Sequence, residues 1–382
     1  MTTNKKNFRI FFFIMILTLI YSCNEKSGNS TSKTQSKEIS IDIRNASNKS
    51  SSIFKKIELV QLETTEASIF NNVSKAKYID DKYFIIVDRD NIVTVFDTKG
   101  AFIANSRKRT GPGPNEYYTL LDVTYNKYTN KFDLLEYDNA IFSYDTQFNF
   151  LSKVKIKRKN VKRFSRFVPI GKSSYILTPT PFEETDKIYF YDTKNEEMDI
   201  VKFEGNVSKV NSQPCPFTAI NSDLFFSPSS FNYSLFSIDI KNKALHSVFN
   251  LNIIHDKFNE KELSNYNPDQ QVDYLLNRSN SVIPLRNLIS TKYIVSVLLK
   301  NQVEYTNIYN RETKTNSIIV SSKSDFIMPD FFAIKDDILY ALVYPYNTKK
   351  YIDIKLLDSK NMKVLNNTNE ELNPLIVKYY LK

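Results

Sequence analysis

Val95-Phe96-Asp97-Thr98-Lys99-Gly100 is the first of several similar segments, each with apolar residues, then Asp or Asn, then a polar turn. The copies are Val95–Gly100, Ser143–Gln147, Phe190–Asn195, Ser237–Asn242, Ile308–Glu312 and Leu356–Asn361. The intervals between their Asp or Asn residues are 48, 47, 47, 71 and 48 residues. This period, in a chain of short Ile-, Val-, Tyr- and Phe-rich runs, predicts one four-stranded blade per copy. Six copies therefore predict an all-β fold, a six-bladed β-propeller.

Asp and Asn are expected to shape the turns, because the 382 residues include only 6 Gly. Their side chains hydrogen-bond the backbone two residues on and tolerate the left-handed conformation. Acidic residues also precede apolar runs, as Asp80-Asp81 precede Tyr83–Val87 and Asp336-Asp337 precede Ile338–Tyr340. Such continuous apolar runs predict second strands that are buried on both faces between neighbouring blades.

The one long interval has about 24 extra residues, which fall between Ile253 and Ser281. Within it Asn267 can cap a helix and Pro268 suits the first turn, so we expect a short helical insertion between blades four and five. Its apolar face would consist of Val272, Leu275 and Leu276. These side chains either pack on the propeller and hold Tyr266 outward, or themselves contact an envelope protein.

The beginning of the chain has the features of a bacterial export signal. Residues 1–22 combine three cations with an apolar run from Ile10 to Ile20, which is too short to span a membrane. Cys23 follows a small residue, so we expect a signal peptide over residues 1–22 and a lipid on the Cys23 thiol. Asn24 comes next, and we expect anchoring in the outer membrane.

The rest of the chain divides into a tether and a folded part. Residues 23–52 are rich in Ser, Asn, Thr and Lys and predict a lipidated flexible tether, with residues 53–382 forming the propeller. Lys56–Leu62 and Leu375–Leu381 are both suitable for closing the ring by pairing strands from the two ends. Which of them is the outermost strand stays open.

Three segments of the chain carry a family resemblance. They are Ile57–Thr65, Gly111–Tyr117, and Asn373-Pro374 with the ending Tyr380-Leu381-Lys382. In these segments the chain resembles the six-bladed β-propeller lipoproteins with NHL-like repeats of Gram-negative envelopes, and the resemblance extends over nearly all of the chain after Cys23. It implies a propeller fold and an envelope location, while most members of that family have no established activity.

Catalytic chemistry has little support in the residues. The two histidines, His246 and His255, share no metal-ligand spacing, and there is no Gly-x-Ser-x-Gly elbow, phosphate-binding glycine loop or cysteine pair. We expect no cofactor, with a calcium site of Asn and Asp ligands left open. The formal charge of +10 is modest for this length, and an exported protein is not expected to meet nucleic acid.

The sharpest local motif is Gly111–Tyr117, whose Pro and Gly residues predict a rigid connection between the first two blades. It is either a structural turn with an internal Arg–Glu contact or an anion-binding lip. The residues of the lip would be Arg107, Arg109, Glu116 and Tyr117.

We therefore expect a non-catalytic binding or scaffold protein, anchored to a membrane through Cys23. One alternative is a metal-dependent hydrolase or lyase of the propeller type. Another is a glycan-binding protein, which the 24 Tyr and 28 Phe allow although Trp is absent, because sugars bind on exposed aromatic rings.

Overall fold

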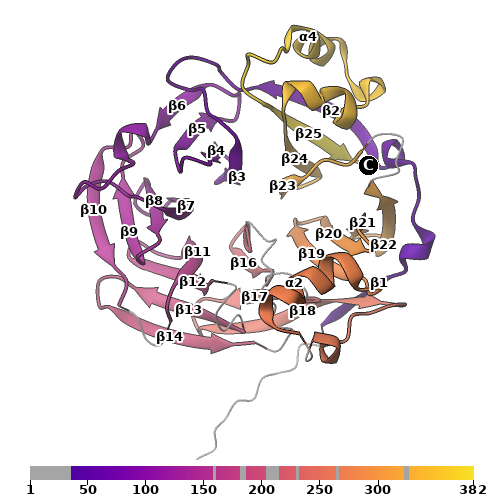
Figure 1. The fold of residues 1–382 in the computed structure, drawn as a ribbon, viewed down its shortest axis with the longest axis horizontal. Helices are drawn as coiled ribbons and strands as arrows, with labels where there is room; N and C mark the ends of the chain where they lie inside the picture. The colour runs from indigo at the N-terminus through magenta and orange to yellow at the C-terminus, as the bar shows by residue number, and fades with distance from the viewer. Residues whose placement is uncertain are drawn as a thin grey trace, which may run out of the picture. The chain divides into compact units, whose positions relative to one another are not determined.

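Six blades, each with four antiparallel strands, stand around a central axis (Figure 1), as the repeat predicts. The computed structural model describes residues 36–157, 161–180, 186–203, 215–228, 232–263, 266–321 and 327–382. In each blade the first strand lies next to the axis and the fourth lies at the rim. Blades are numbered here from the one that begins at Val73.

The first three blades each use four consecutive strands of the chain. Blade one consists of β3 (Val73–Ile79), β4 (Tyr83–Asp88), β5 (Val93–Asp97) and β6 (Phe102–Asn105). Blade two consists of β7 (Leu120–Asn126), β8 (Lys131–Glu136), β9 (Ala140–Tyr144) and β10 (Phe150–Lys155). Blade three consists of β11 (Phe164–Pro169), β12 (Ser174–Pro179), β13 (Lys187–Asp192) and β14 (Glu197–Lys202).

Blades four to six repeat this order, except that the last strand of blade six comes from the beginning of the chain. Blade four consists of β15 (Phe217–Ile220), β16 (Asp223–Phe226), β17 (Ser234–Asp239) and β18 (Ala244–Ile253). Blade five consists of β19 (Ile283–Ile289), β20 (Tyr293–Lys300), β21 (Val303–Asn310) and β22 (Thr315–Val320). Blade six consists of β23 (Phe331–Lys335), β24 (Ile338–Val343), β25 (Leu375–Leu381) and β2 (Phe54–Gln61).

The pairing of β2 with β25 closes the ring and answers which end supplies the outermost strand. The two strands are antiparallel, with Leu59 opposite Val377. Their side chains join a core cluster shared by blades five and six. Strand β2 is therefore the rim strand, and β25 is the third strand of blade six.

Five of the six repeated segments end a strand, as predicted, and in each blade this is the third strand. Their Asp or Asn side chain accepts hydrogen bonds from the following backbone. In blade one, for example, Asp97 Oδ1 accepts from the N–H groups of Lys99 at 2.8 Å and Ala101 at 2.9 Å. The sixth segment was interpreted wrongly. Asp358 caps the helix α4 (Ser359–Asn367) by accepting from the N–H of Asn361 at 2.8 Å. The same side-chain chemistry serves a turn and a helix start, so the sequence pattern does not separate them.

The predicted second strands and their turns are also confirmed. Strand β4 is buried along nearly its whole length, and the turn before it has positive φ at Asp80 and Asp81. Asn221 and Asp336 hold the same left-handed conformation before β16 and β24. Asp and Asn thus supply the turn geometry for which the chain has few glycines.

The helices lie in connections between strands and are short. The insertion between blades four and five contains η4 (Glu260–Leu263), α2 (Pro268–Asp273) and the π-type turn η5 (Tyr274–Arg278). Asn267 and Gln270 form a capping box at the start of α2, with Pro268 in the first turn, so this predicted insertion is confirmed. A second helical insertion, which the repeat pattern does not predict, lies between β24 and β25. It contains η7 (Pro345–Asn347), α3 (Thr348–Tyr351), η8 (Ile354–Leu356) and α4.

The expected tether extends less far than residue 52. Lys37–Ile41 form β1, which pairs in parallel with β18 at the rim of blade four. Ile39 and Ile41 are buried there, because their alternate spacing on a strand directs both into the same cluster. The rest of the segment before β2 contains η1 (Ile43–Asn45) and η2 (Ser50–Ile53). The predicted signal peptide and Cys23 lie outside the described residues.

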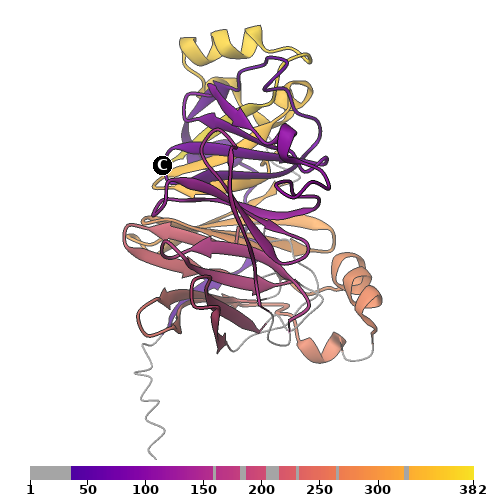
Figure 2. The ribbon, with the colours of Figure 1, turned by 90° about the vertical axis from the view of Figure 1, so that its left-hand side faces the viewer.

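The two mouths of the ring differ in what they carry. Strand directions alternate within each blade. The turns between first and second strands and those between third and fourth strands therefore lie on the same face of the ring, which we call the turn face. Connections between blades lie on the opposite face, the connection face. Helix α2 projects from this face, towards the viewer in Figure 1 and to the right in Figure 2.

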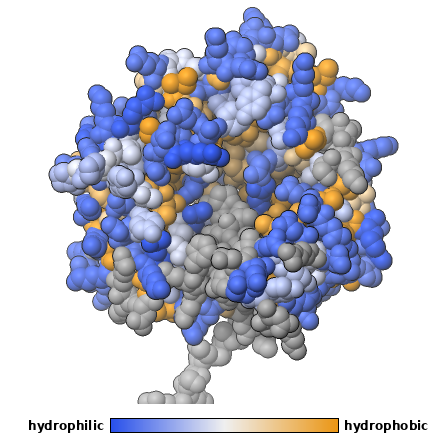
Figure 3. All heavy atoms as spheres, viewed as in Figure 1, coloured by the Kyte–Doolittle hydropathy of each residue, from blue (hydrophilic) through white to orange (hydrophobic). Residues whose placement is uncertain are grey.

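The surface of the connection face is mostly hydrophilic, with hydrophobic residues in small separate patches (Figure 3). Among the residues that the structure describes, no helix combines the length and the apolar character needed to cross a membrane.

Candidate functional site

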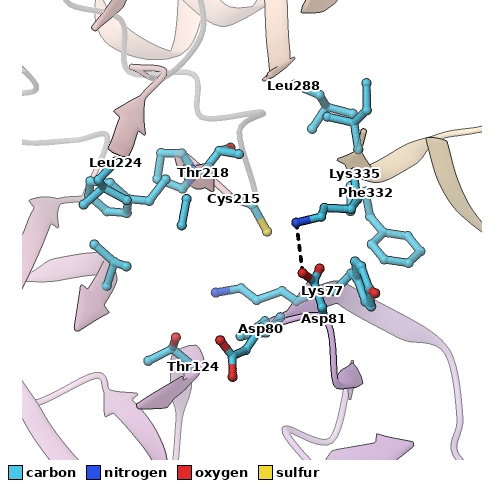
Figure 4. Close-up of a pocket in the computed structure, with 18 of the residues that line it drawn as sticks. Lys77, Asp80, Asp81, Thr124, Cys215, Thr218, Leu224, Leu288, Phe332 and Lys335 are labelled. Carbon is cyan, nitrogen blue, oxygen red and sulfur yellow. Dashed lines mark ion pairs between the residues drawn. The ribbon is translucent and has the colours of Figure 1, made fainter. Parts of the chain in front are cut away.

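A cavity of about 420 Å³ lies on the axis of the ring, and the first strands of all six blades contribute to its wall. Apolar side chains form part of this wall, among them Phe167, Phe217, Leu288 and Phe332. Towards the turn face the cavity is lined by charged residues, including Lys335, which makes an ion pair of 2.9 Å with Asp81 (Figure 4). We call this space the central cavity.

Lys77 and Asp122 line the cavity and belong to a larger group of charged side chains between blades one, two and three. Asp122, on β7, is almost fully buried and accepts from two lysines of β3. Its Oδ1 lies 2.6 Å from Lys77 Nζ and 3.1 Å from Lys75 Nζ. Its Oδ2 accepts from the backbone N–H of Phe167, on β11, at 3.2 Å. One carboxylate thus links the first strands of blades one, two and three.

Backbone carbonyls hold the cations of this group in place. Lys77 Nζ donates to Val123 O at 2.9 Å and Lys75 Nζ donates to Leu121 O at 2.7 Å. Leu121 O also accepts from Arg166, at 3.3 Å. Three cationic side chains therefore gather around one carboxylate, and we call Lys75, Lys77, Arg166 and Asp122 the cationic cluster.

The crowding of positive charge changes the proton affinities within the cluster. Burial alone would raise the pKa of Asp122, but the three neighbouring cations outweigh it and lower the pKa to about 2. Burial, followed by the charge of Arg166, lowers the pKa of Lys75 to about 7. Asp122 is thus a permanent anion at neutral pH, whereas Lys75 exchanges its proton in the physiological range.

Cys215 lines the same cavity, and its sulfur points into the open space in Figure 4. Burial raises the pKa of this thiol, so it is mainly protonated at neutral pH. A protonated thiol is a poor nucleophile, so Cys215 is a wall residue of the cavity whose thiol reacts slowly.

The Gly111–Tyr117 motif forms a folded connection between β6 and β7, preceded by η3 (Arg107–Arg109). Tyr117 is fully buried and donates to Asn91 O at 2.7 Å. Arg109 donates to Phe148 O at 2.8 Å, and Glu116 accepts from the N–H of Gly113 at 3.0 Å.

Arg107 is exposed and donates to Ile69 O at 3.0 Å. These contacts join the connection to the blades that it links, as expected for a structural turn. The internal contact of the turn is between Glu116 and the backbone of Gly113.

The insertion between blades four and five packs on the propeller with its apolar side. Leu275 is buried in the cluster between these blades, while Leu276 is half-buried. Tyr266 stacks on Tyr274, with ring centroids 4.8 Å apart. Val272 lies on α2, and the placement of its side chain is outside the described part. Of the two expectations for the apolar face of the insertion, packing on the propeller holds for Leu275.

Neither histidine lines the central cavity. His246 lies on β18 at the rim of blade four, and His255 lies shortly after it. Among the described residues, no three His, Cys, Asp or Glu side chains stand close enough together to hold a metal ion.

A second hollow, of about 480 Å³, lies on the connection face between blades six and one. Tyr346 is 64% exposed there and stacks on Tyr344, with ring centroids 5.4 Å apart. Tyr344 is fixed because its hydroxyl accepts from the N–H of Val73 at 2.9 Å. Polar side chains, among them Asp90 and Glu371, complete the wall. We call this hollow the tyrosine groove.

The cationic cluster is not among the sites expected from the sequence. A signal for it exists, because Lys75 and Lys77 are two residues apart just before the Asp80-Asp81 turn. The repeat makes this segment a first strand, so one face of it had to line the axis. Two lysines on such a face predict positive charge in the cavity.

A family model described as a domain of unknown function (DUF4934) matches residues 38–380. No curated protein matches the chain. Among solved structures, the chain is similar to a protein of Bacteroides fragilis whose name records that it is expected to be exported. The identity is 16%, the match covers 90% of this chain and 99% of that one, and the TM-score is 0.72. At 16% identity, the similarity between the two proteins shows a shared fold alone.

Two more distant similarities are to U3-55K and to BamB from Moraxella catarrhalis. For U3-55K the identity is 8%, with 88% of this chain and 100% of that chain covered and a TM-score of 0.43. For BamB the identity is 10%, with 86% and 100% covered and a TM-score of 0.39. These values are too low to support an argument about this protein.

Proposed function

We propose a function from the premise that this chain belongs to the family described as a domain of unknown function (DUF4934). The protein is a non-catalytic binding module of the bacterial envelope, held to the membrane by a lipid on Cys23. Its propeller binds a small ligand in the central cavity without transforming it. The observation that carries this proposal is a cavity of about 420 Å³ whose wall combines apolar side chains with buried charges.

Small-molecule sites are cavities of this kind, mostly apolar with a few placed polar groups that orient the ligand. The volume is within the range of about 300–1,000 Å³ that such sites have. Asp122 already accepts from two lysines and a backbone N–H, so it holds the first strands together and is not available as a general base.

Cys215 provides the test. In protein carrying Cys23→Ser, Cys215 is the only thiol, since the sequence contains 2 Cys. We expect a ligand in the central cavity to slow the reaction of Cys215 with a small thiol reagent. A panel of sugars, uronic acids, sugar phosphates and dicarboxylic acids is screened in this way. The control protein carries Cys215→Ser and Ser40→Cys, with its thiol at an exposed rim position.

At least one compound should protect Cys215 without protecting the control thiol. Leu288→Trp fills part of the cavity and should abolish this protection. If no class of compound protects Cys215, or if both thiols are protected equally, the central cavity is not a ligand site and the proposal fails.

The lipid anchor rests on the residues before and at Cys23. The cysteine follows a short apolar run and a small residue, and a diacyl group at this position holds a protein stably at a membrane. Cells fed a fatty-acid analogue should label the wild-type protein and leave Cys23→Ala unlabelled. Equal labelling of the two proteins would refute the anchor.

Glycan binding in the tyrosine groove is a second candidate function, favoured by the exposed ring of Tyr346 beside carboxylate side chains. Sugar rings stack on such an aromatic face while Asp and Glu accept from hydroxyl groups. A glycan array should show a ligand that Tyr346→Ala no longer binds. Tyr118→Ala is the matched control, because Tyr118 is 69% exposed and does not line the groove. Loss of binding in both variants, or in neither, would contradict this function.

A further inference from the structure

We propose that the outer edge of β10, at the rim of blade two, binds an extended acidic segment of a partner protein as an added strand. This inference goes beyond the proposed function, because it concerns the rim of the ring and needs no ligand in the central cavity. Among the strands that the structure describes, none pairs with this edge, and β10 lies at the left-hand rim of Figure 1.

The chain binds backbone groups of four other rim strands with its own residues. Strand β1 pairs with the outer edge of β18 and makes blade four a five-stranded sheet. The other three contacts are single hydrogen bonds, from the N–H of Val320 on β22 to Ser47 O at 3.0 Å, from that of Leu59 on β2 to Asn361 Oδ1 at 2.7 Å, and from that of Phe102 on β6 to Glu63 Oε2 at 2.9 Å. An edge without such contacts presents unpaired backbone groups to other chains. The pairing of β1 with β18 shows that a blade of this protein accepts an added strand.

The backbone of β10 has hydrogen-bonding groups that face outwards. The N–H of Ile156 donates to Asn139 O, just before β9, at 2.8 Å. Because backbone direction alternates along a strand, the N–H and C=O groups of Lys153 and Lys155 point away from β9. Within the described part of the chain, these groups have no hydrogen-bond partner. They are therefore available to a strand from another protein.

A hollow of about 630 Å³ lies beside the same edge. Its wall consists of the consecutive residues Lys153–Lys157 and of Glu196, in the turn between β13 and β14 of blade three. Successive side chains of a strand point to opposite faces, so they line one space only where that space lies along the edge of the strand. An added strand would lie about 4.8 Å from β10 in the plane of the blade, which is the place of this hollow.

The charges along the edge favour one composition of the partner. Lys153, Lys155 and Lys157 are exposed, and the first two side chains lie on the same face of β10 because they are two residues apart. Lysines on an open edge repel basic strands and disfavour apolar ones, which would remove the charges from water. A strand with carboxylates at every second position instead places them directly opposite these lysines, where opposite charges attract.

The rim strand of blade three is less suited to such a partner. Among the described strands, none pairs with the outer edge of β14. Its exposed positions, however, combine Glu197 and Asp199 with Lys202, and Asp199 forms an ion pair with Lys243 of blade four. Because these charges have both signs, they select no acidic strand, and we assign the added strand to β10.

Fluorescence anisotropy tests the inference with a labelled peptide of four Glu-Val repeats. We expect this peptide to bind the wild-type protein, and a peptide of four Lys-Val repeats to bind at least tenfold more weakly. A fully N-methylated Glu-Val peptide keeps its charges but has no N–H groups for the edge, so it should also bind at least tenfold more weakly.

Two substitutions at one position separate the charge from the backbone pairing. Lys155→Gln removes a charge and should weaken binding of the acidic peptide about twofold to fivefold. Lys155→Pro also removes an outward N–H and should weaken binding at least tenfold, while the fold tolerates proline on an edge strand whose N–H faces solvent. Lys202→Gln, at an exposed position of β14, is the matched control and should leave the affinity unchanged.

Hydrogen exchange of the wild-type protein covers the case in which Lys155→Pro does not fold. The acidic peptide should slow exchange at the amides of Lys153 and Lys155 and leave that of Val154, which faces β9, unchanged. If the acidic peptide does not bind, if the N-methylated peptide binds equally, or if these two amides are not protected, the inference is wrong. It is also wrong if the protein alone forms a dimer in sedimentation that Lys155→Pro abolishes, because a second copy then occupies the edge.

Discussion

Replacing Lys75 with methionine should make the protein more stable at and below neutral pH, although it removes contacts of the ammonium group. Burial and the charge of Arg166 lower the pKa of Lys75 from 10.5 to about 7. The unfolded chain keeps this proton up to about pH 10.5, whereas the folded protein releases it above about pH 7. Protonated Lys75 therefore opposes folding fully below pH 7, and stability rises with pH between the two values.

The magnitude follows from this difference in proton affinity. Each pKa unit corresponds to about 1.4 kcal/mol, so the charged ammonium costs roughly 5 kcal/mol below pH 7. The methionine variant also lacks the hydrogen bond from the Lys75 amine to Leu121 O, which costs about 1 kcal/mol. We expect a net stabilisation on the order of 2–4 kcal/mol. The unfolding entropy of a domain of this size is about 0.7 kcal/mol per kelvin, so Tm should rise by about 3–6 °C.

Scanning calorimetry of the wild type, Lys75→Met and Lys99→Met near pH 6.5 and near pH 10 measures this effect. The gain of Lys75→Met should be large at the lower pH and should nearly vanish at the higher pH. Lys99→Met should follow the wild type at both values. A Lys75→Met protein that melts below the wild type near pH 6.5, or that gains equally at both pH values, would refute the reasoning.

Three further predictions concern the packing of the ring. Ile41→Ala should lower the free energy of unfolding by about 2–5 kcal/mol, because it leaves a cavity. Glu38→Ala, on the exposed side of β1, should change it by at most about 0.5 kcal/mol. Equal denaturation midpoints for the two variants would show that β1 is not docked. Asn361→Ala removes the side-chain oxygen that accepts from the backbone N–H of Leu59 at 2.7 Å. It should lower the free energy of unfolding by about 1–3 kcal/mol and speed hydrogen exchange at the Leu59 amide. Unchanged exchange at this amide would contradict the contact. Asp122→Asn removes the carboxylate that forms ion pairs with Lys75 and Lys77 and should cost about 3–5 kcal/mol at neutral pH. Because the folded pKa of Asp122 is about 2, below its ordinary 3.8, the carboxylate stabilises above pH 4, and the difference in urea midpoints should shrink between about pH 4 and pH 2.

The propeller could be predicted because its turns depend on local chemistry. Asp97 and four equivalent residues mark the ends of third strands through hydrogen bonds to the next few N–H groups, so each turn is encoded in a few neighbouring residues. Asp358 uses the same hydrogen bond to cap a helix, and here the pattern misled. The docking of Ile39 and Ile41 was missed because it depends on β18, more than 200 residues away.

The candidate site was harder to predict than the fold. Lys75, Asp122 and Arg166 come from three different blades and are brought together only when the first strands surround the axis. A single sequence shows each of them as an ordinary charged residue in a strand. The residues that stood out locally, such as Tyr117, stood out because a tight connection needs them, and Tyr117 is fully buried.

The rim strand β2 has a consequence for the order in which the molecule can fold. Leu59 leaves the ribosome, and any export channel, more than 300 residues before its partner Val377. Pairing across such a separation is slow, because much of the chain must be ordered before the two strands meet. Until then β2 and β24 both present unpaired edges that can join other chains. Folding of this protein should therefore depend on factors that shield a nascent chain, and interruptions of synthesis before Leu375 should yield aggregates and not a five-bladed protein.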